Sequence, residues 1–475
     1  MSGRLGRPAL PRPGVVALLA LAELMLTLDL SIVNVALPAI RGELGFSQSS
    51  LQWVVNGYAL TFGGFLLLGG RAADLFGGRR VFLGALGAFT LASLACGLAP
   101  GQPVLVAARA VQGLSAGVLS PATLSILTAT YTRPAQRNRA LSVWTAVAIG
   151  GGAVGALLGG ALTELLSWRW IFFVNPPVGL GLLAFGAARL PRAAGTARRG
   201  LDLAGAVTVT AGLTALVWAL IRSGALGWAA GEVLAGLVAA ALLLGAFVVV
   251  ETRVARAPLV PFSVFRSPLV RAGNLLSFLS FLPVMATWFF LTLYLQAVRG
   301  FTPAEAGYLF LPMSLAVVAG SQVSFRAVAH SDARLLFAAG GLLAAAGLAW
   351  LARLSPATGL PWVLGPASVA MAGGGLMFAP ITLAAVAGVP ADQGGLASGL
   401  LNTSRQIGGV LGLAILATVA GAAGTPTGGF DSAFLAGAGI FVATALAGAL
   451  ALPGELGAPR RQAPAPVSTS TTTPR

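Results

Sequence analysis

Two acidic residues interrupt the first long apolar stretch of this chain. Glu23 and Asp29 lie inside a segment that runs from Gly14 to Pro38 and carries no other charge. About 20 helical residues span the hydrocarbon of a bilayer, so this segment is long enough to cross one. An acid at the centre of such a helix costs roughly 2.5 to 3.5 kcal/mol on insertion scales, and retained acids typically mark an ion or substrate path. We therefore predict that Asp29 exchanges protons, and that Glu23 is a second proton site or a contact for a cationic ligand.

The main alternative is a structural one, in which an acid pairs with a buried arginine only to hold two helices together. Arg109 is the candidate partner of Asp29. Arg109 lies about 18 residues from one end of its apolar run and Asp29 about 15 from the corresponding end of its own, so at 1.5 Å per residue their depths agree within roughly one turn. If a conformational change altered their separation, the proton affinity of the carboxylate would change with it. The sequence alone leaves both roles open.

The composition places the chain in a membrane. Of its 475 residues, 57% are hydrophobic and 9% are charged, whereas soluble domains are closer to a quarter charged. Long runs of Leu, Ala and Gly without two-residue alternation predict helices rather than barrel strands. The formal charge of +16 comes from arginines alone, in short clusters between apolar runs. Such clusters are typical topology signals, so no nucleic-acid partner is expected.

Most enzymatic and metal chemistry is disfavoured by what the chain lacks. It has one cysteine, Cys96, and one histidine, His330, so neither a thiolate cluster nor a histidine metal site is expected. Because the chain has no lysine, its glycine-rich runs do not make a phosphate-binding P-loop. A membrane enzyme would need clustered His, Asp or Cys at a membrane face. We expect no metal, no cofactor and no enzymatic activity.

Fourteen apolar runs, each long enough to cross a bilayer, follow one another along the chain. They cover approximately residues 14–38, 51–70, 81–99, 103–126, 140–163, 171–188, 203–221, 231–250, 272–297, 304–325, 334–354, 361–386, 394–421 and 431–451. The ends and one alternate set of connections hold 22 arginines, and the other set holds 5. Since arginine accumulates on the cytoplasmic side, both termini are predicted to be cytoplasmic.

The connection between the second and third runs carries a charged turn motif. It reads Gly70-Arg-Ala-Ala-Asp74-Leu-Phe-Gly77-Gly-Arg79-Arg80. The glycines allow a tight turn, Asp74 can cap a helix N-terminus, and the two arginines can pair with it or with lipid phosphate, so we predict a cytoplasmic latch. This connection resembles the signature of the major facilitator superfamily. Arg109-Ala-Val-Gln112-Gly113 is similar to the fourth-span motif of that superfamily, whose arginine is associated with proton transfer.

The fifth run contains a ladder of glycines. Gly151, Gly155 and Gly159 recur every four residues, with Gly160 beside them. Small residues at this spacing let another helix approach closely. The segment resembles the antiporter motif of exporters in the same superfamily, although that motif has proline where this chain has Ala156.

Further segments give a finer resemblance that covers nearly the whole chain. They are Leu28 to Pro38, Trp53 to Tyr58, Trp168 to Pro177 and Leu401 to Gly409. Together they resemble the fourteen-span drug:proton antiporter group. The resemblance implies an all-α integral membrane protein of the major-facilitator fold, with two six-helix bundles and two helices inserted between them. The implied parts are a cytoplasmic N-terminus (1–13), a first bundle (14–190), the inserted helices with flanking loops (191–267), a second bundle (268–452) and a disordered cytoplasmic tail (453–475).

The resemblance also implies a function. It implies a monomeric exporter in the bacterial inner or plasma membrane that moves hydrophobic, cationic compounds outward by alternating access against inward proton flow. Export of an endogenous metabolite or antibiotic, and import, stay open as alternatives. Polar and aromatic side chains that could line a substrate cavity are Asn34, Trp53, Tyr58, Gln112, Asn274, Trp288 and Gln296. For Arg405, within the thirteenth run, a structural ion pair and a gating role are equally open.

Overall fold

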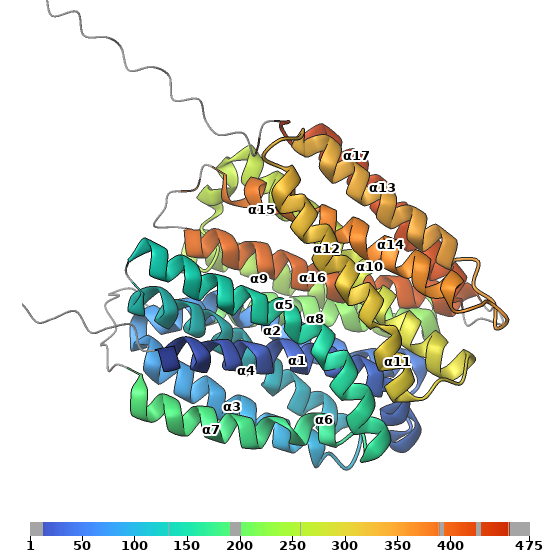
Figure 1. Ribbon diagram of the computed structural model, residues 1–475, viewed down its shortest axis with the longest axis horizontal. Helices are drawn as coiled ribbons and strands as arrows, with labels where there is room; N and C mark the ends of the chain where they lie inside the picture. The colour runs from blue at the N-terminus through green and yellow to red at the C-terminus, as the bar shows by residue number, and fades with distance from the viewer. Residues whose placement is uncertain are drawn as a thin grey trace, which may run out of the picture.

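The computed structural model describes residues 13–131, 133–190, 201–256, 258–387, 389, 394–423, 429–454 and 456. These residues form helices and their connections, with no strand among them (Figure 1). The first half contains α1 (Pro13–Leu44), α2 (Gln48–Phe76), α3 (Gly78–Gly97), α4 (Gln102–Thr130), α5 (Pro134–Leu165), α6 (Trp170–Phe173) and α7 (Asn175–Arg189). Then come α8 (Leu203–Leu226), α9 (Gly231–Val249) and the short turns η1 (Val250–Val254) and η2 (Phe262–Arg266). The second half contains α10 (Pro268–Leu293), η3 (Tyr294–Val298), α11 (Pro303–Leu309), α12 (Leu311–Ala327), α13 (Ala333–Leu351), α14 (Pro361–Leu376), α15 (Phe378–Val386), α16 (Gly394–Ala423) and α17 (Phe430–Ala451).

The all-helical prediction is confirmed for the described residues. Thirteen stretches of helix there are long and apolar enough to cross a membrane. A further helix, α5, has 32 residues, several of whose side chains are outside the described set. The predicted count of fourteen spans therefore stays a prediction. The predicted N-terminal segment 1–13 and tail 453–475 lie almost wholly outside the described residues.

Several helices differ from the apolar runs that predicted them. Helix α1 continues past Pro38 to Leu44, because a membrane helix does not have to end where its apolar run does. The run 171–188 is divided into α6 and α7, next to Pro176 and Pro177. Proline lacks the N–H that would continue the helical ladder, so a break before this pair is expected.

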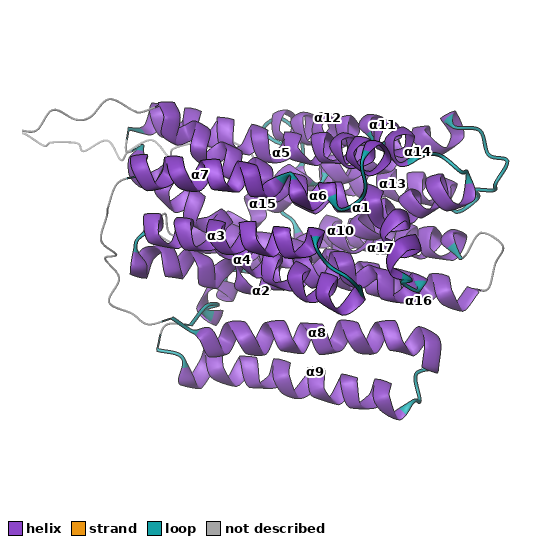
Figure 2. Cartoon of the chain, turned by 90° about the horizontal axis from the view of Figure 1, so that it is seen from below, coloured by secondary structure: helices purple, strands orange, loops and turns teal. Residues whose placement is uncertain are grey.

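The helices form two groups with a hairpin beside them. Helices α1 to α7 pack on one another, and α10 to α17 form the second group. The groups meet where α2 packs on α16 and where α5 packs on α11. Helices α8 and α9 form a hairpin at the side, and α8 packs on both α2 and α16 (Figure 2). The hairpin therefore lies across the seam between the two groups.

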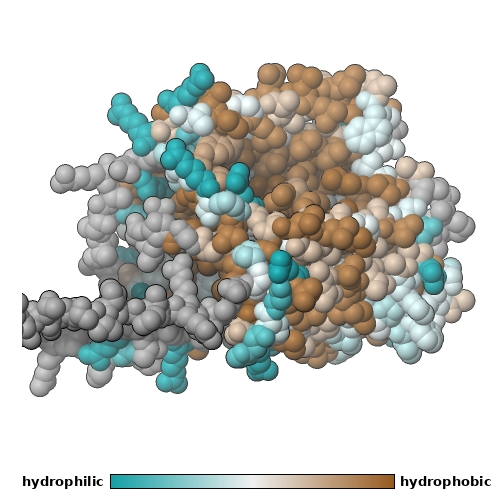
Figure 3. Space-filling model, turned by 90° about the horizontal axis from the view of Figure 1, so that it is seen from above, coloured by the Kyte–Doolittle hydropathy of each residue, from teal (hydrophilic) through white to brown (hydrophobic). Residues whose placement is uncertain are grey.

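The outer surface is suited to lipid. Large apolar side chains such as Leu91, Leu242 and Leu450 are exposed although they lie on long helices. Figure 3 shows apolar side chains over the broad middle of one face, with hydrophilic side chains gathered mostly toward one end. In water this surface would cause aggregation, whereas acyl chains can cover it.

The glycine ladder of α5 lies against α1. A Cβ added at Gly151 would overlap Thr27, and one at Gly155 would overlap Ser31 and lie 2.9 Å from the Leu28 carbonyl oxygen. At Gly159 it would lie 2.6 Å from the carbonyl oxygen of Ile32. The Ser31 hydroxyl also donates to the Gly151 carbonyl at 3.3 Å. The contact leaves room for the small side chains of α1 but for none on the α5 side.

On the neighbouring ridge, α5 meets the second group. A Cβ at Gly160 would overlap Pro303, at the start of α11. A Cβ at Gly307 of α11 would in turn lie 2.6 Å from the carbonyl oxygen of Ala156. One helix therefore uses two adjacent ridges of small residues, one toward its own group and one toward the other.

We expect Gly155→Ala to lower the thermal midpoint of the purified protein by several degrees. The added methyl group has no room between α1 and α5, and overpacking of this kind costs about 1 to 3 kcal/mol. Gly150→Ala is the matched control, because nothing lies within 4 Å of its added Cβ, and alanine there should hold or slightly raise the midpoint. Equal midpoints for the two variants would contradict the packing argument.

Candidate functional site

Asp29 and Arg109 form a fully buried ion pair inside the first group of helices. One Nη of Arg109 on α4 lies 2.6 Å from an Oδ of Asp29 on α1, and neither side chain is accessible to solvent. The match in depth predicted from the sequence brings these two residues into direct contact. Helices α1 and α4 are thus joined by a charge pair in a region that the surrounding helices seal.

Three neutral side chains complete the site around the other Asp29 oxygen. The Gln112 amide donates to it at 2.7 Å, and the Asn175 amide donates at 2.8 Å. Both amides also donate to the Ser93 hydroxyl, at 3.1 and 2.9 Å. The site therefore draws on α1, α3, α4 and α7, and the carboxylate accepts from three separate side chains.

Arg109 is held as firmly as its partner. Its Nε donates to the Val54 carbonyl at 3.0 Å and its Nη to the Gln112 side-chain oxygen at 2.7 Å. The Tyr58 ring lies 4.3 Å from the guanidinium carbon and the Phe172 ring 5.7 Å from it. Because the guanidinium keeps partners in α2 and α4 as well, it would stay in place if Asp29 became neutral.

Glu23 lies one and a half turns before Asp29 and is also buried. Its two oxygens accept from the hydroxyls of Ser120 at 3.1 Å and Thr123 at 3.4 Å. The Trp144 indole N–H donates to Thr123 at 3.2 Å, which extends the chain of hydrogen bonds to α5. Glu23 forms no ion pair with any described residue. It is thus a carboxyl group that neutral donors serve, unlike Asp29.

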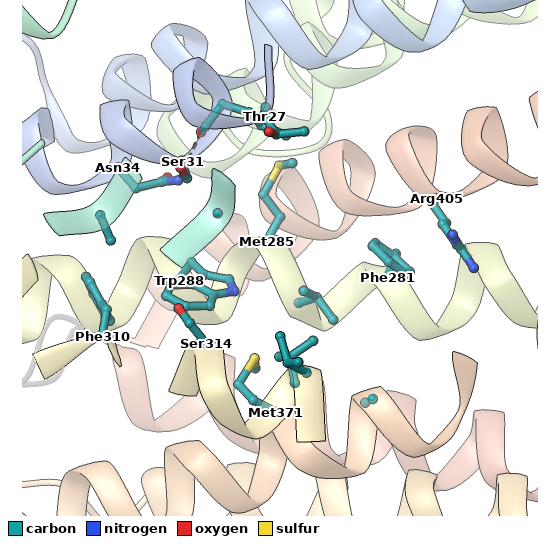
Figure 4. A pocket seen from close by; sticks show the side chains of 18 of the residues that line it. Thr27, Ser31, Asn34, Phe281, Met285, Trp288, Phe310, Ser314, Met371 and Arg405 are labelled. Atoms are coloured by element: carbon teal, nitrogen blue, oxygen red, sulfur yellow. Dashed lines mark hydrogen bonds between the residues drawn. The ribbon is translucent and has the colours of Figure 1, made fainter. Parts of the chain in front are cut away.

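A cavity of about 410 Å³ lies between the two groups of helices (Figure 4). It is lined by α1, α2, α5, α10, α12, α14, α15 and α16 and includes polar, aromatic and thioether side chains. Those labelled in Figure 4 are Thr27, Ser31, Asn34, Phe281, Met285, Trp288, Phe310, Ser314, Met371 and Arg405. The site around Asp29 does not open into this cavity, since none of its members is among the lining residues.

Two of the seven side chains proposed for a cavity line it, namely Asn34 and Trp288. The other five lie elsewhere: Tyr58 and Gln112 are in the Asp29 site, Trp53 packs with α8 and α16, Asn274 accepts from Ser404, and Gln296 donates to the Val35 carbonyl. Residue type identified them as polar or aromatic, but their position around the helix decides where they point.

Sequence reasoning missed several lining residues and one member of the buried site. Asn175 lies in the segment from Trp168 to Pro177 and no role was predicted for it, although a lone amide in an apolar run before two prolines is a usable signal. Ser280, Ser314 and Met285 carry no special signal, because such residues are common in membrane helices. Arg405 was noted, and only the structure places it in the cavity.

The charged turn between α2 and α3 is compact, but its charges are spread out. Gly77 adopts a φ of 87°, which favours glycine, and a Cβ at Gly78 would lie 2.8 Å from Ile126. Asp74 caps neither adjoining helix and forms no ion pair with the described residues. Arg79 donates instead to the Ala187 carbonyl near the end of α7 at 2.7 Å, where the helix dipole favours a cation.

Gly70 and Arg80 complete the predicted latch. A Cβ at Gly70 would make an ordinary contact with Pro121 at 3.7 Å, so this position has room for a side chain. Arg80 is exposed, and none of the hydrogen bonds or ion pairs described for the chain involves its side chain. An exposed arginine at a helix start is free to meet lipid phosphate.

The turn between α12 and α13 occupies the corresponding place in the second half. The Asp332 carboxylate accepts from the Arg334 backbone at 2.8 Å and pairs with the Arg334 guanidinium at 2.9 Å. The guanidinium holds the pKa of this exposed carboxyl below its usual range. The acid here caps its own helix, so the two turns are built differently.

Two hydrogen bonds join the groups at one end of the cavity. The Gln296 amide in η3 donates to the Val35 carbonyl in α1 at 2.7 Å, and the Ala304 backbone N–H donates to the Glu164 carboxylate in α5 at 3.0 Å. The close glycine packing of α5 on α11 lies at the same end. The two groups of helices are therefore held together at the end where α11 begins.

Comparison with known proteins agrees with this architecture. The family model described as Major Facilitator Superfamily matches residues 19–413. The cephamycin export protein CmcT of Amycolatopsis lactamdurans is 46% identical over 405 residues, which cover 84% of this chain and 83% of that protein. The puromycin resistance protein of Streptomyces alboniger is 42% identical over 412 residues, covering 86% and 81%.

A solved structure supports the fold independently of close sequence similarity. The crystal structure of the POT family transporter PepTSo superposes with a TM-score of 0.67 at 17% identity, covering 92% of this chain and 97% of that one. With many apolar helices and bacterial export and resistance proteins among its relatives, the chain is a multi-pass protein of the bacterial plasma membrane, and these relatives point to a transporter. It belongs to the Major Facilitator Superfamily.

Proposed function

We propose that this protein is a proton-coupled secondary active exporter that moves hydrophobic small molecules outward by alternating access. The observation that carries the proposal is that α1 contributes both to the cavity and to the Asp29 site. Thr27, Ser31 and Asn34 fall on one face of this helix and line the cavity, while Asp29 points into the sealed site with Arg109. Proton binding and substrate binding would then bias the position of the same helix.

Protonation of Asp29 would supply the switch. Loss of its charge weakens the bond to Arg109 and the two amide bonds that converge on the carboxylate, while Arg109 keeps the Val54 carbonyl and the Gln112 oxygen. Helix α1 is then less firmly tied to α4 and can shift along the smooth ridge of α5. A ligand or proton moves such an equilibrium only by its differential affinity for the two states.

Glu23 is proposed as the second proton site. It does not line the cavity, and its donors are two hydroxyl groups, which serve either the protonated or the charged form of the acid. Together with Asp29 it places two carboxyl groups of α1 in contact with α4. One elementary charge crossing 100 mV supplies about 2.3 kcal/mol, so transport needs no ATP-binding motif.

The proposed organisation is two six-helix bundles (14–190 and 268–452), with the inserted helices within 191–267, fourteen spans and both termini cytoplasmic. In this orientation the hydrogen-bonded end near α11 faces outward, and the cavity is poised to load from the cytoplasm. The turn from Gly70 to Arg80 is proposed to limit opening on the cytoplasmic side. We propose that the protein is a monomer.

Export of an antibiotic or of a metabolite that the host makes is the second candidate for the substrate. The names of the relatives favour it, because one is a cephamycin export protein and another a puromycin resistance protein. Counterflow driven by an imposed pH gradient in proteoliposomes gives the direction of coupling. Uptake in the direction of proton flow would replace export by import.

Asp29→Asn should abolish proton-driven efflux in inverted vesicles while gradient-independent exchange of substrate persists. The amide keeps the shape of the side chain but cannot bind or release the proton. Glu232→Gln is the matched control, since this exposed carboxylate pairs with Arg222 at 2.6 Å far from the site and its loss should leave efflux unchanged. Proton-driven efflux at the wild-type rate in the Asp29 variant would remove the role we assign to it.

Replacing Arg109 with alanine should shift the pH dependence of transport toward more alkaline pH. A nearby positive charge favours the deprotonated carboxylate, so Asp29 would hold its proton to higher pH without it. Transport rates measured across a pH series, at constant membrane potential, test the shift. Superimposable profiles for wild type and variant would contradict the coupling.

A double-mutant cycle separates coupling from simple helix locking. Arg109→Gln or Asp29→Asn alone leaves a buried group without its ionic partner, which costs roughly 3 to 5 kcal/mol when a buried pair is broken. The double variant should recover much of this stability, measured as the thermal midpoint, yet remain unable to drive efflux. A double variant that regains both stability and proton-driven transport would show that the pair acts only as a structural lock.

A further inference from the structure

The charge in the central cavity comes from a single side chain. Among the described residues that line it, Arg405 on α16 is the only ionisable one, and no Asp or Glu faces it there. The carboxylates of α1 are turned away into the sealed sites of the first bundle. The field in the cavity is therefore positive, which disfavours the cationic compounds that the sequence resemblance implies.

Arg405 lacks an anionic partner within the described part of the chain. Its Nη donates one long hydrogen bond of 3.4 Å to the Thr382 hydroxyl, and its Nε is buried with no partner. No described salt bridge includes it. Arg109, the other arginine inside a span, pairs with an acid at 2.6 Å. A guanidinium has five N–H donors, so Arg405 keeps most of its donors available.

Two aromatic rings hold this guanidinium in position. Its carbon lies 4.8 Å from the centre of the Phe378 ring and 5.6 Å from that of Phe281, and both residues line the cavity. Stacking fixes the plane of the group and limits its motion without consuming its hydrogen-bond donors. A guanidinium fixed in this way is prepared for bidentate binding of a planar carboxylate.

The side chains that line the rest of the cavity indicate the shape and polarity of such a ligand. Met285 and Trp288 lie between Arg405 and the polar end near Asn34, and Phe310 lies at that far end (Figure 4). At that end the Asn34 side-chain oxygen is buried without a hydrogen-bond donor. A matching ligand has an acidic group, an apolar or aromatic body, and a donor at the far end.

We propose that the substrate site of this exporter binds carboxylate-bearing aromatic or apolar compounds, with Arg405 as the anchor for the carboxylate and Asn34 as the acceptor at the opposite end. This inference rests on the proposed function and names the substrate class of the same cavity. It replaces the expected preference for cations. Arg405 has no described acid with which to form a structural ion pair, and binding of the substrate anion gives its charge a partner.

The test compares three probes of one shape, namely 2-naphthoate, 2-naphthamide and 2-naphthylmethylammonium. Binding is measured on the purified full-length protein by calorimetry, without any proton gradient. The wild type should bind naphthoate about tenfold more tightly than the amide, as expected for a charge-assisted hydrogen-bonded pair, and should bind the ammonium most weakly. A wild type that binds none of the three, or that prefers the amide or the ammonium, overturns the proposal.

Variants then assign the preference to one residue. Arg405→Gln should bring the naphthoate to amide ratio close to one, whereas Arg405→Lys should keep part of the preference as a point charge without the fork. Arg353→Gln removes an exposed arginine outside the cavity and should keep the wild-type ratio. An undiminished ratio in Arg405→Gln overturns the assignment. If that variant does not fold, the Arg405→Lys ratio decides, and a full wild-type preference there overturns the bidentate anchor.

The two proposals fail in distinguishable ways. If no Asp29 variant loses proton-driven efflux, the proposed coupling is wrong, and the binding preference is unaffected. A binding preference that ignores Arg405 would defeat the carboxylate site and leave the coupling intact. Equilibrium binding needs no gradient, so it does not depend on whether protons drive transport.

Discussion

A charge inside a bilayer must find a partner, and the interior of this protein is arranged around two solutions to that constraint. Asp29 and Arg109 form a direct ion pair at 2.6 Å, out of contact with solvent. Arg405 is stabilised only in part, by two rings and one hydroxyl. Removing one partner of a buried ion pair leaves a costly unpaired charge, so the Asp29–Arg109 pair resists separation. Arg405 already lacks an ionic partner, so binding of an anion would stabilise it. This difference separates a site for protons from a site for substrate.

Helix α1 contributes both to the Asp29 site and to the cavity that contains Arg405. Its cavity face and its acidic face point in different directions, so the helix itself is the physical link between them. Close packing on α5 matters for the same reason. Where Gly155 meets Ser31, the α5 side of the interface carries no side chain, so only the small Thr27 and Ser31 side chains of α1 have to move if the two helices slide past each other. A bulky ridge would fix α1 and separate the chemistry of the proton from the shape of the cavity.

The helices could be predicted from the sequence because hydropathy in a membrane is a strong and local signal. The Asp29 pair could also be predicted, since depth along a helix follows from counting residues at about 1.5 Å each. Counting does not fix the angle around the axis or the tilt of a neighbour. For that reason Tyr58 and Gln112, proposed for a cavity, belong to the sealed site, and Asn175 was overlooked although it donates to Asp29. Of the latch residues only Gly77 lies between α2 and α3, since Gly70 and Asp74 belong to the end of α2 and Arg79 and Arg80 to the start of α3. The partners of Asp74 and Arg79 depend on which helix ends lie beside them.

The sign of charge in the cavity was hardest to predict because it is a property of faces rather than of composition. Acidic residues in the first span suggest a cation path when the helix is considered alone. Once α1 is placed against α4, both of its carboxyl groups are used within the first bundle, and the cavity keeps only a cation that the second bundle supplies. The protein thereby keeps the groups that bind protons apart from the group that faces the substrate. An anionic substrate and a proton can then occupy the same carrier without competing for the same atoms, and α1 is the element through which each affects the other.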